Sequence, residues 1–266
     1  MSIITLTTDF GAADWFVGTL KGVILGLQPR VQIVDITHDI PAGKIRAGAF
    51  ALAASYKFFP KHTIHVAVVD PGVGSRRRAI AVRTARYVFV GPDNGVLWFA
   101  LARERIRAIH QITNERLFFH PPSNTFHGRD VFAPVAACLS KGMPIQKVGP
   151  ATKACVRLAW PEPECSADSI AGEVVYLDRF GNAITNIDSD AVAAIGPAVG
   201  EVVVRNKRVC SLNSFYTAVP PGKAVALVGS CGLLEIAVSG GSAAHRLGLQ
   251  VGNRVVVRRR KPGPSQ

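Results

Sequence analysis

The feature that most constrains this chain is a nearly continuous apolar run at residues 63–69, which ends directly at Asp70. Such a run is typical of a strand that is buried on both faces of a parallel sheet. Strand-like and helix-like segments alternate around it, which predicts an α/β domain with a mostly parallel sheet. The expected strands are residues 3–7, 31–36, 79–83 and 87–90, and the expected helices are residues 15–27, 48–58 and 131–139.

The second half of the chain has a different pattern. Short β-rich runs separated by Gly, Pro, Asn and Asp predict a small all-β domain, a barrel or a sandwich. The pattern changes at residues 160–168, a Pro-containing stretch that we interpret as a linker, so we expect domains at residues 1–162 and 169–262. The expected strands are residues 173–177, 184–187, 200–204, 224–228, 233–238 and 253–259.

The formal net charge of +13 raises the question of an acidic partner such as nucleic acid. Basic residues form runs only at 76–78 and 258–261, without interleaved aromatic residues, so we expect no nucleic-acid partner. The five cysteines include no CxxC pair, which argues against a disulfide framework or a zinc site. We see no signal peptide and no apolar run of the ~20 residues that a membrane span needs, so we expect a cytoplasmic protein.

Four polar clusters, at residues 7–11, 69–74, 91–95 and 124–130, adjoin predicted strands or helices. In an α/β sheet, ligands bind beyond the carboxyl ends of the strands. Asp9 either caps the helix that follows it or accepts hydrogen bonds from a ribose diol. Asp70 and a following arginine form either part of a site or a simple ion pair.

The two remaining clusters are more ambiguous. The Asp93-Asn94-Gly95 sequence is more typical of a turn than of a site. His127 stands between Gly, Arg and Asp at an expected helix start, and it belongs to a site only if Asp70 and Arg77 lie near it in space. Composition and spacing therefore indicate an α/β enzyme with an Asp/Arg/His site and no metal motif.

Taken together and in order, the motifs resemble the S-adenosyl-L-methionine (SAM) hydroxide adenosyltransferases, relatives of the fluorinases and chlorinases. The resemblance implies an N-terminal α/β catalytic domain, a C-terminal β-barrel and a homotrimer. Its active sites would lie between the N-terminal domain of one subunit and the C-terminal domain of its neighbour. The matching motifs are TDFG at 8–11, VDPGVGSRRR at 69–78, GPDNG at 91–95, TFHGRDVFAP at 125–134, DRFGN at 178–182 and VGSCGLLEIAVSGGSAA at 228–244.

The resemblance implies that SAM is the substrate and is hydrolysed to adenosine and L-methionine. We expect this reaction to need no cofactor and no metal. An activated water would attack C5′ in line with the bond to sulfur, and positioning would supply much of the rate. Asp70 would take a proton, Arg77 would stabilise the developing hydroxide, and His127 would orient the water or share the proton. Whether Asp70 or His127 is the formal base stays open, as does the choice of Arg77 over Arg76 and Arg78.

The same resemblance assigns substrate contacts. Asp9 would bind the ribose hydroxyls, with Phe59 and Pro60 lining the sugar pocket. Other residues would come from the C-terminal domain: Asp178 and Ser230 for the methionine end, Phe180 and Phe215 flanking adenine, and Asn182, Ser239 and Gly240 at the adenine edge. Core packing is the alternative for the two phenylalanines. At Ser239 the family commonly has asparagine, and at Cys231 a different residue.

Two other functions compete with hydrolysis. A chlorinase-like halide transferase would attack the same carbon, but halogenases lack the full triad. Fluorinases also insert a loop where this chain has a short turn at residues 84–86. A non-catalytic nucleoside-binding protein would use the same cleft without turnover.

Overall fold

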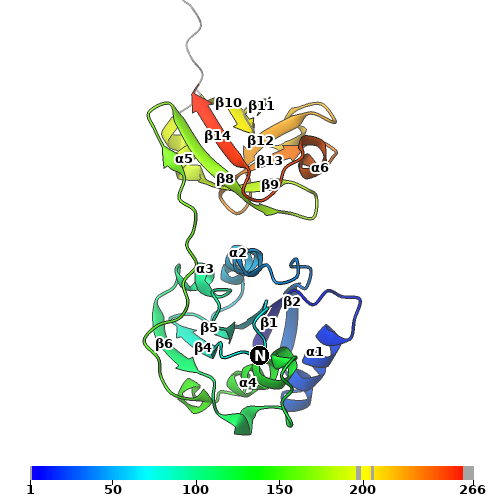
Figure 1. Cartoon of the computed structure of the whole chain (residues 1–266), viewed down its shortest axis with the longest axis vertical. Helices are drawn as coiled ribbons and strands as arrows, with labels where there is room; N and C mark the ends of the chain where they lie inside the picture. Colours follow the sequence, from blue (N-terminus) through cyan, green and yellow to red (C-terminus); the bar gives the residue numbers. More distant parts are fainter. Residues whose placement is uncertain (1, 196–198, 205–206, 260–266) are drawn as a thin grey trace, which may run out of the picture. The chain divides into compact units, whose positions relative to one another are not determined.

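The computed structural model describes residues 2–195, 199–204 and 207–259 (Figure 1). The chain forms two compact units, Met1–Leu158 and Ala159–Gln266. Each unit has its own sheet and its own hydrophobic core. The prediction of an α/β domain followed by an all-β barrel domain is confirmed.

The sheet of the N-terminal unit has the strand order β2-β1-β3-β5-β4-β6. Its β1/β2, β1/β3 and β3/β5 pairs are parallel, whereas β4 is antiparallel to both β5 and β6. The mixed character has a local cause, because the short turn between β4 and β5 permits only antiparallel pairing. Sequence analysis did not predict β6. The strands are β1 Ile3–Thr8, β2 Gln32–Thr37, β3 Ile64–Val68, β4 Ala79–Thr84, β5 Val88–Pro92 and β6 Ile106–Gln111.

Helices cover both faces of this sheet (Figure 1). Leu20 and Ile24 of α1 lie four residues apart, one turn along the same helix face, and both are buried in the core. The core on this face also contains most of α4. The helices are α1 Phe16–Leu27, α2 Ile45–Ser55, α3 Trp98–Leu101 and α4 Ala133–Ser140.

The C-terminal unit is an antiparallel, nearly closed barrel with the order β11-β10-β14-β8-β9-β13-β12 and β7 paired to β8. The two ends of this order meet, because the segment after β11 hydrogen-bonds to Ala226 of β12 through Ser211 and Asn213. Sequence analysis predicted neither β11 nor the short helices. The elements are β7 Glu164–Cys165, β8 Ser169–Leu177, β9 Ala183–Asp188, α5 Ser189–Ile195, β10 Val199–Val204, β11 Lys207–Cys210, β12 Ala224–Val228, β13 Leu233–Val238, α6 Ala243–Leu247 and β14 Arg254–Arg259.

The boundary between the units follows from local contacts. Leu158 packs against Gly95, where an added Cβ would lie 2.5 Å from the leucine Cγ, so Leu158 belongs to the first unit. Pro161 is bound to the second unit by a 2.7 Å hydrogen bond from Asn186 to its carbonyl. The first unit therefore ends at Leu158 in the structure, whereas the sequence pattern placed its end at residue 162.

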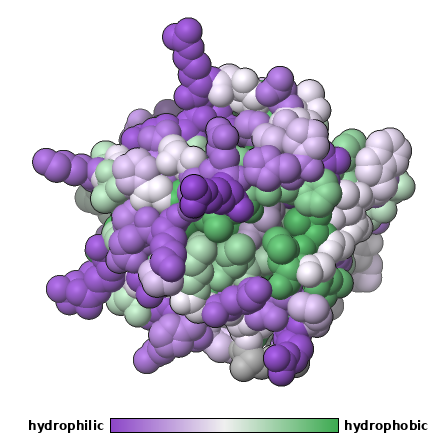
Figure 2. All heavy atoms as spheres, turned by 90° about the horizontal axis from the view of Figure 1, so that it is seen from below, coloured by the Kyte–Doolittle hydropathy of each residue, from purple (hydrophilic) through white to green (hydrophobic). Residues whose placement is uncertain are grey.

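The surface is mainly polar where Figure 2 shows it. The view from below shows long hydrophilic side chains around a smaller apolar area. Within the described part of the chain, none of the helices combines the length and apolarity of a membrane span.

Candidate active site

The predicted polar clusters gather at one edge of the N-terminal sheet. Strands β1, β3 and β5 are neighbouring and parallel, so the residues that follow them meet at the carboxyl edge. Asp9 follows β1, Asp70 follows β3 and Asp93 follows β5. Asn94 connects two of these ends, because its side-chain amide donates to the Val69 carbonyl at 2.8 Å.

Asp70, Arg77 and His127 are in direct contact at this edge. Arg77 Nε donates to Asp70 Oδ1 at 2.9 Å, and Arg77 Nη2 lies 2.5 Å from Asp70 Oδ2 and 2.8 Å from His127 Nδ1. The contact to Oδ2 is an ion pair without hydrogen-bond alignment, so this buried oxygen has no well-aligned donor among the described residues. The Asp70 and Arg77 side chains are 5% and 12% exposed. Three residues from two motifs, VDPGVGSRRR and TFHGRDVFAP, thus form one largely buried polar group.

The guanidinium of Arg77 fixes the tautomer of His127. Arginine has only donors, so His127 Nδ1 must accept and the proton of the neutral ring must lie on Nε2. Burial and the adjacent Arg77 cation lower the pKa of His127, and nearby Asp70 and Asp130 only partly oppose this. Neutral His127 therefore holds Arg77 in place through Nδ1.

A close backbone approach brings the His127 loop to the Asp70 loop. Gly74 has φ +77°, and an added Cβ would lie 2.3 Å from the Asn124 carbonyl oxygen. Only glycine permits both this conformation and this approach. The second glycine of the VDPGVG motif therefore positions residue 124, three positions before His127.

Aromatic packing holds the same loop from the other side. The Phe10 and Phe126 rings pack edge to face at 5.7 Å, and Phe126 also packs against Phe16 at 5.2 Å. An added Cβ at Gly128 would lie 3.1 Å from Phe10. The TDFG motif thus contributes to the site through Phe10 as well as through Asp9.

A π-helical turn at Gly128–Phe132 precedes α4, where sequence analysis placed the start of a helix at residue 131. Buried Asp130 in this turn pairs with Arg129 and accepts a 2.8 Å hydrogen bond from the Ser123 amide. Burial alone would raise the pKa of Asp130, but the hydrogen bonds from Arg129 and Ser123 lower it overall. Phe132, at the end of the turn, presents its ring 5.5 Å from the Arg77 guanidinium.

The three successive arginines have different surroundings. Arg78 binds Asp93 and also donates to Thr152 and to the Ala154 carbonyl, so it fastens the end of the unit to the sheet. Arg76 is exposed. Arg77 is the arginine that the structure places against both Asp70 and His127. Asp93 behaves as a structural residue, since it also accepts from the Val156 amide at 2.7 Å.

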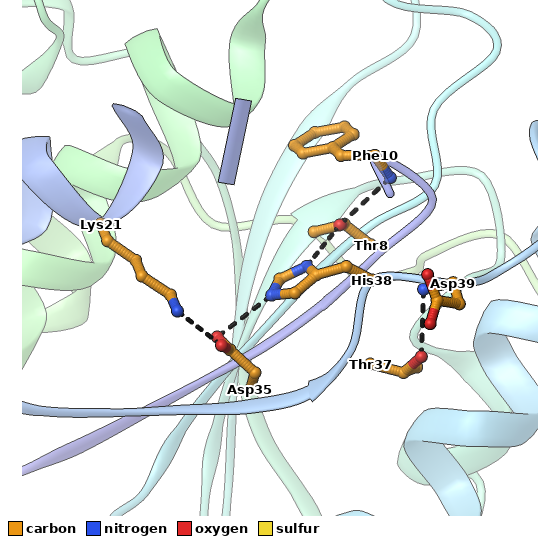
Figure 3. Close-up of polar contacts among 7 residues, drawn as sticks. All are labelled: Thr8, Phe10, Lys21, Asp35, Thr37, His38 and Asp39. Atoms are coloured by element: carbon orange, nitrogen blue, oxygen red, sulfur yellow. Dashed lines mark hydrogen bonds and ion pairs between the residues drawn. The ribbon is translucent and has the colours of Figure 1, made fainter. Parts of the chain in front are cut away.

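Asp9 does not cap α1, which begins at Phe16 without a side-chain cap. Its Oδ2 accepts a 2.8 Å hydrogen bond from the Gly43 amide. The end of β1, just before Asp9, is held by a chain of polar contacts, shown in Figure 3. This chain runs from Lys21 through Asp35 and His38 to the Thr8 hydroxyl. Thr8 in turn accepts from the Phe10 amide at 3.3 Å, so this chain fixes the backbone on both sides of Asp9.

Phe59 and Pro60 lie elsewhere. They precede β3 and so stand at the amino edge of the sheet, while Asp70 follows β3 at the carboxyl edge. The five residues of β3 span roughly 17 Å. Phe59 packs against the buried ring of His65 at 5.7 Å. The structure does not bring these two residues to Asp9, and we do not retain them in the candidate site.

The C-terminal unit contains a separate cavity of about 490 Å³. Of the predicted residues, Phe180, Asn182 and Gly240 line it. Phe180 and Phe215 are 77% and 57% exposed, so neither packs in the core as the alternative interpretation required. The further lining residues, which sequence analysis missed, are Tyr216, Val238 and Gly241.

Hydrogen bonds order the walls of this cavity. Asp178 accepts from both the backbone and the side-chain amide of Asn182, at 2.8 and 2.9 Å, within the tight DRFGN turn. Tyr216 donates to Glu235 at 2.7 Å. Burial raises the pKa of Glu235, and the neighbouring Asp178 charge adds to this effect.

Glu235 was also missed, although a lone carboxylate inside the apolar run 233–238 was a usable signal. An added Cβ at Gly229 would lie 2.5 Å from Glu235 Oε2, so Glu235 supports the turn that carries exposed Ser230. Ser239 is buried, and its amide donates to the Lys223 carbonyl at 3.0 Å.

Among the described residues, no group of three or more His, Cys, Asp or Glu side chains could hold a metal ion.

Comparison with known proteins covers both units. The family model for the SAM hydroxide adenosyltransferase N-terminal domain matches residues 4–149, and the model for the C-terminal domain matches residues 172–256. The chain is 41% identical over 261 residues to a Salinispora arenicola protein named (R)-S-adenosyl-L-methionine hydrolase, covering 96% of this chain and 97% of the relative. It is 27% identical over 289 residues to a fluorinase of Nocardia brasiliensis, covering 96% of each chain.

A solved structure is also similar. The crystal structure of an uncharacterized conserved protein from Thermotoga maritima superimposes with a TM-score of 0.91 at 35% identity. The similarity covers 97% of this chain and 100% of that one.

Proposed function

The chain belongs to the SAM hydroxide adenosyltransferase family, and from this premise we propose that it hydrolyses SAM to adenosine and L-methionine. The observation that carries the proposal is the buried contact of Asp70, Arg77 and His127 at the carboxyl edge of the sheet. This group offers an acceptor and a cation together, which is what activation of a water requires.

The proposed reaction is one in-line displacement. The water oxygen forms a bond to C5′, the C5′–sulfur bond breaks, and its electron pair leaves on the sulfur of methionine. The leaving group is neutral, so it needs no acid, and the proton of the water passes to a base. The difficulty lies with the weak nucleophile, and general-base assistance contributes about 10²–10⁴-fold in rate.

We assign the base to Asp70. His127 Nδ1 accepts from Arg77, and the ring proton lies on Nε2, so the neutral imidazole has no free acceptor for the water proton. Asp70 Oδ2 lacks a well-aligned donor and is the acceptor left over. Arg77 stabilises the developing hydroxide, and His127 positions Arg77.

The substrate contacts are proposals on the same premise. Asp9, fixed by Gly43 and the Thr8–His38 contact, binds the ribose hydroxyls. In the C-terminal unit, the exposed rings of Phe180 and Phe215 suit adenine, with Asn182, Ser239 and Gly240 at its edge. Asp178 and Ser230 hold the methionine end.

The assembly is proposed as a homotrimer whose sites combine the N-terminal unit of one subunit with the C-terminal unit of its neighbour. This proposal is supported by the distribution of the residues along the chain. The proposed water-handling residues precede Leu158, and the proposed adenine and methionine contacts follow it.

The five cysteines are free thiols, which is compatible with the cytoplasmic, reducing location that we propose.

Incubation with SAM tests the function, with adenosine and L-methionine as expected products. The relative's name specifies the (R) form, so the two sulfonium epimers are assayed separately and we expect the (R) epimer to turn over faster. Chloride and fluoride are added in parallel, since a 5′-halo-adenosine would identify a halide transferase instead. Binding without turnover would identify a nucleoside-binding protein.

The same assay tests the proposal that no metal or cofactor is needed. Turnover should continue unchanged in excess chelator, because a sulfonium leaving group needs no Lewis acid. Activity that disappears with chelator and returns with a divalent ion would contradict the proposal.

A further inference from the structure

The N-terminal unit contains a cavity of about 450 Å³ at the amino edge of the sheet. The first residues of β1, β3 and β5 line it, so it is at the opposite strand ends from Asp70. The proposed hydrolysis makes no use of this cavity. Its volume falls within the range of about 300–1,000 Å³ that is typical of small-molecule sites.

The lining of the cavity is strongly basic. Lys61, His62, Arg83 and Arg86 line it, and none of its described lining residues is acidic. Glu104, which accepts a hydrogen bond from the Thr84 hydroxyl at 3.1 Å, is a nearby carboxylate but does not line the cavity. The basic side chains thus have no anion of their own within the cavity wall.

Other lining residues supply different chemistry. Ile64, Val88 and Leu139 contribute apolar surface, and Ser2, Thr63 and Ser140 contribute hydroxyl groups. A ligand with a charged end and a polar, carbon-based body would match these three kinds of surface. A bare ion would leave the apolar part of the wall uncovered.

The wall is built rigidly. His62 has φ +72°, an uncommon conformation for a non-glycine residue, and its amide donates to the Arg86 carbonyl at 2.6 Å. Tyr87 donates to the Phe59 carbonyl at 3.1 Å, and the Arg86 guanidinium lies 5.1 Å from the Tyr87 ring. These contacts lock the loop before β3 onto the turn between β4 and β5. Strained backbone of this kind is retained where surrounding structure over-determines it.

We propose that this amino-edge cavity binds a small organic phosphate, with Arg83, Arg86 and Lys61 on the phosphate and the hydroxyl and apolar walls against its body. Arginine presents planar donors that match phosphate oxygens. The proposal is independent of SAM hydrolysis, so either can fail without the other.

The test uses ribose 5-phosphate as the probe and uncharged ribose as its matched control, with binding measured by calorimetry and by amide chemical shifts. Ribose 5-phosphate should bind, ribose should not, and the shifts should centre on Ala85, Ser140 and Gly142. The double variant Arg83→Gln/Arg86→Gln should weaken binding about 100-fold, or tenfold per arginine, which is ~1.4 kcal/mol each.

A second double variant, Arg107→Gln/Arg116→Gln, removes the same charge from exposed residues that do not line the cavity. It should change the affinity less than twofold, and both double variants should retain SAM hydrolysis and a wild-type circular dichroism spectrum. Equal weakening in the two would show a diffuse charge effect and overturn the proposal. So would shifts centred on His127, or binding of an oligonucleotide without binding of ribose 5-phosphate.

Discussion

Single side chains carry the proposed chemistry, and their protonation states follow from their neighbours. Arg77 touches an acceptor on each side, the Asp70 carboxylate and His127 Nδ1. One cation thereby fixes the tautomer of the imidazole and the orientation of the carboxylate. The proposed roles of base and positioning group separate because arginine cannot accept a hydrogen bond.

Replacing the proposed base should slow turnover strongly while sparing binding. In Asp70→Asn the side chain keeps its size but loses basicity, so kcat should fall by roughly 10²–10⁴-fold with little change in the Kd for SAM. Single-turnover kinetics and calorimetry measure the two quantities. Asp168→Asn, which removes an exposed carboxylate of the C-terminal unit, is the control and should behave as wild type. Wild-type turnover by Asp70→Asn would refute the assignment.

The titration of His127 should be displaced toward acid. Burial and the Arg77 cation lower its pKa, so NMR titration should give a midpoint below the ordinary value of 6.5. Its contribution to stability is complete above pH 6.5 and is lost as pH falls through the folded-state pKa. Activity should decline over the same acid range, because protonated His127 can no longer accept from Arg77. A midpoint at or above 6.5 would contradict the proposed tautomer.

Among the elements, the loops that follow strands decide whether the site exists. β3 delivers Asp70 to the carboxyl edge, and the π-helical turn before α4 delivers His127. The two loops meet at the Gly74–Asn124 approach, where there is no room for a side chain. The glycine spacing of the VDPGVG motif therefore sets the geometry of a histidine fifty-three residues later.

Two glycine substitutions separate loop docking from backbone strain. Gly74→Ala and Gly142→Ala both force alanine into a left-handed conformation, at a cost of roughly 1–2 kcal/mol each. Only at Gly74 does the new Cβ meet a carbonyl oxygen, at 2.3 Å, whereas at Gly142 nothing lies within 4 Å. Both variants should therefore lose thermal stability, but Gly74→Ala alone should lose at least about tenfold in kcat through misplacement of His127. Equal kcat values in the two variants would show that this approach does not position the site.

At the scale of the whole molecule, the candidate residues fall into two groups on two separate units. The proposed water-handling group lies on the α/β unit, and the exposed aromatic rings lie on the barrel. Neither group alone can bind and hydrolyse SAM under the proposed mechanism. The assembly is therefore part of the catalytic proposal.

Complementation between inactive variants tests the shared site. Asp70→Ala disables the N-terminal unit, and Ser230→Arg blocks the methionine contacts of the C-terminal unit. If subunits exchange and sites are shared, an equal mixture should regain up to about one quarter of wild-type activity, since one site in four pairs two intact units. The controls are each variant assayed alone and the two variants combined under conditions that do not let their subunits exchange. A mixture that stays inactive despite exchange, or a fully active monomer by light scattering, would exclude the shared site.

The sequence by itself determined the fold class and the site motifs. Apolar runs ending in carboxylates are local patterns, and they correctly predicted the strands whose ends carry Asp9 and Asp70. Short β-rich runs likewise predicted the barrel. These features are readable because burial and turn formation impose local spacing on the chain.

Only the tertiary structure decided which residues meet. It placed Arg77, rather than Arg76 or Arg78, against His127, because strand direction and the Gly74–Asn124 approach orient the loop. It placed Phe59 at the amino edge of the sheet, away from Asp70, because a strand of about 17 Å separates positions that are close in sequence. It also paired Tyr216 with Glu235 across the barrel. Such contacts depend on the pairing of distant segments, which no local spacing records.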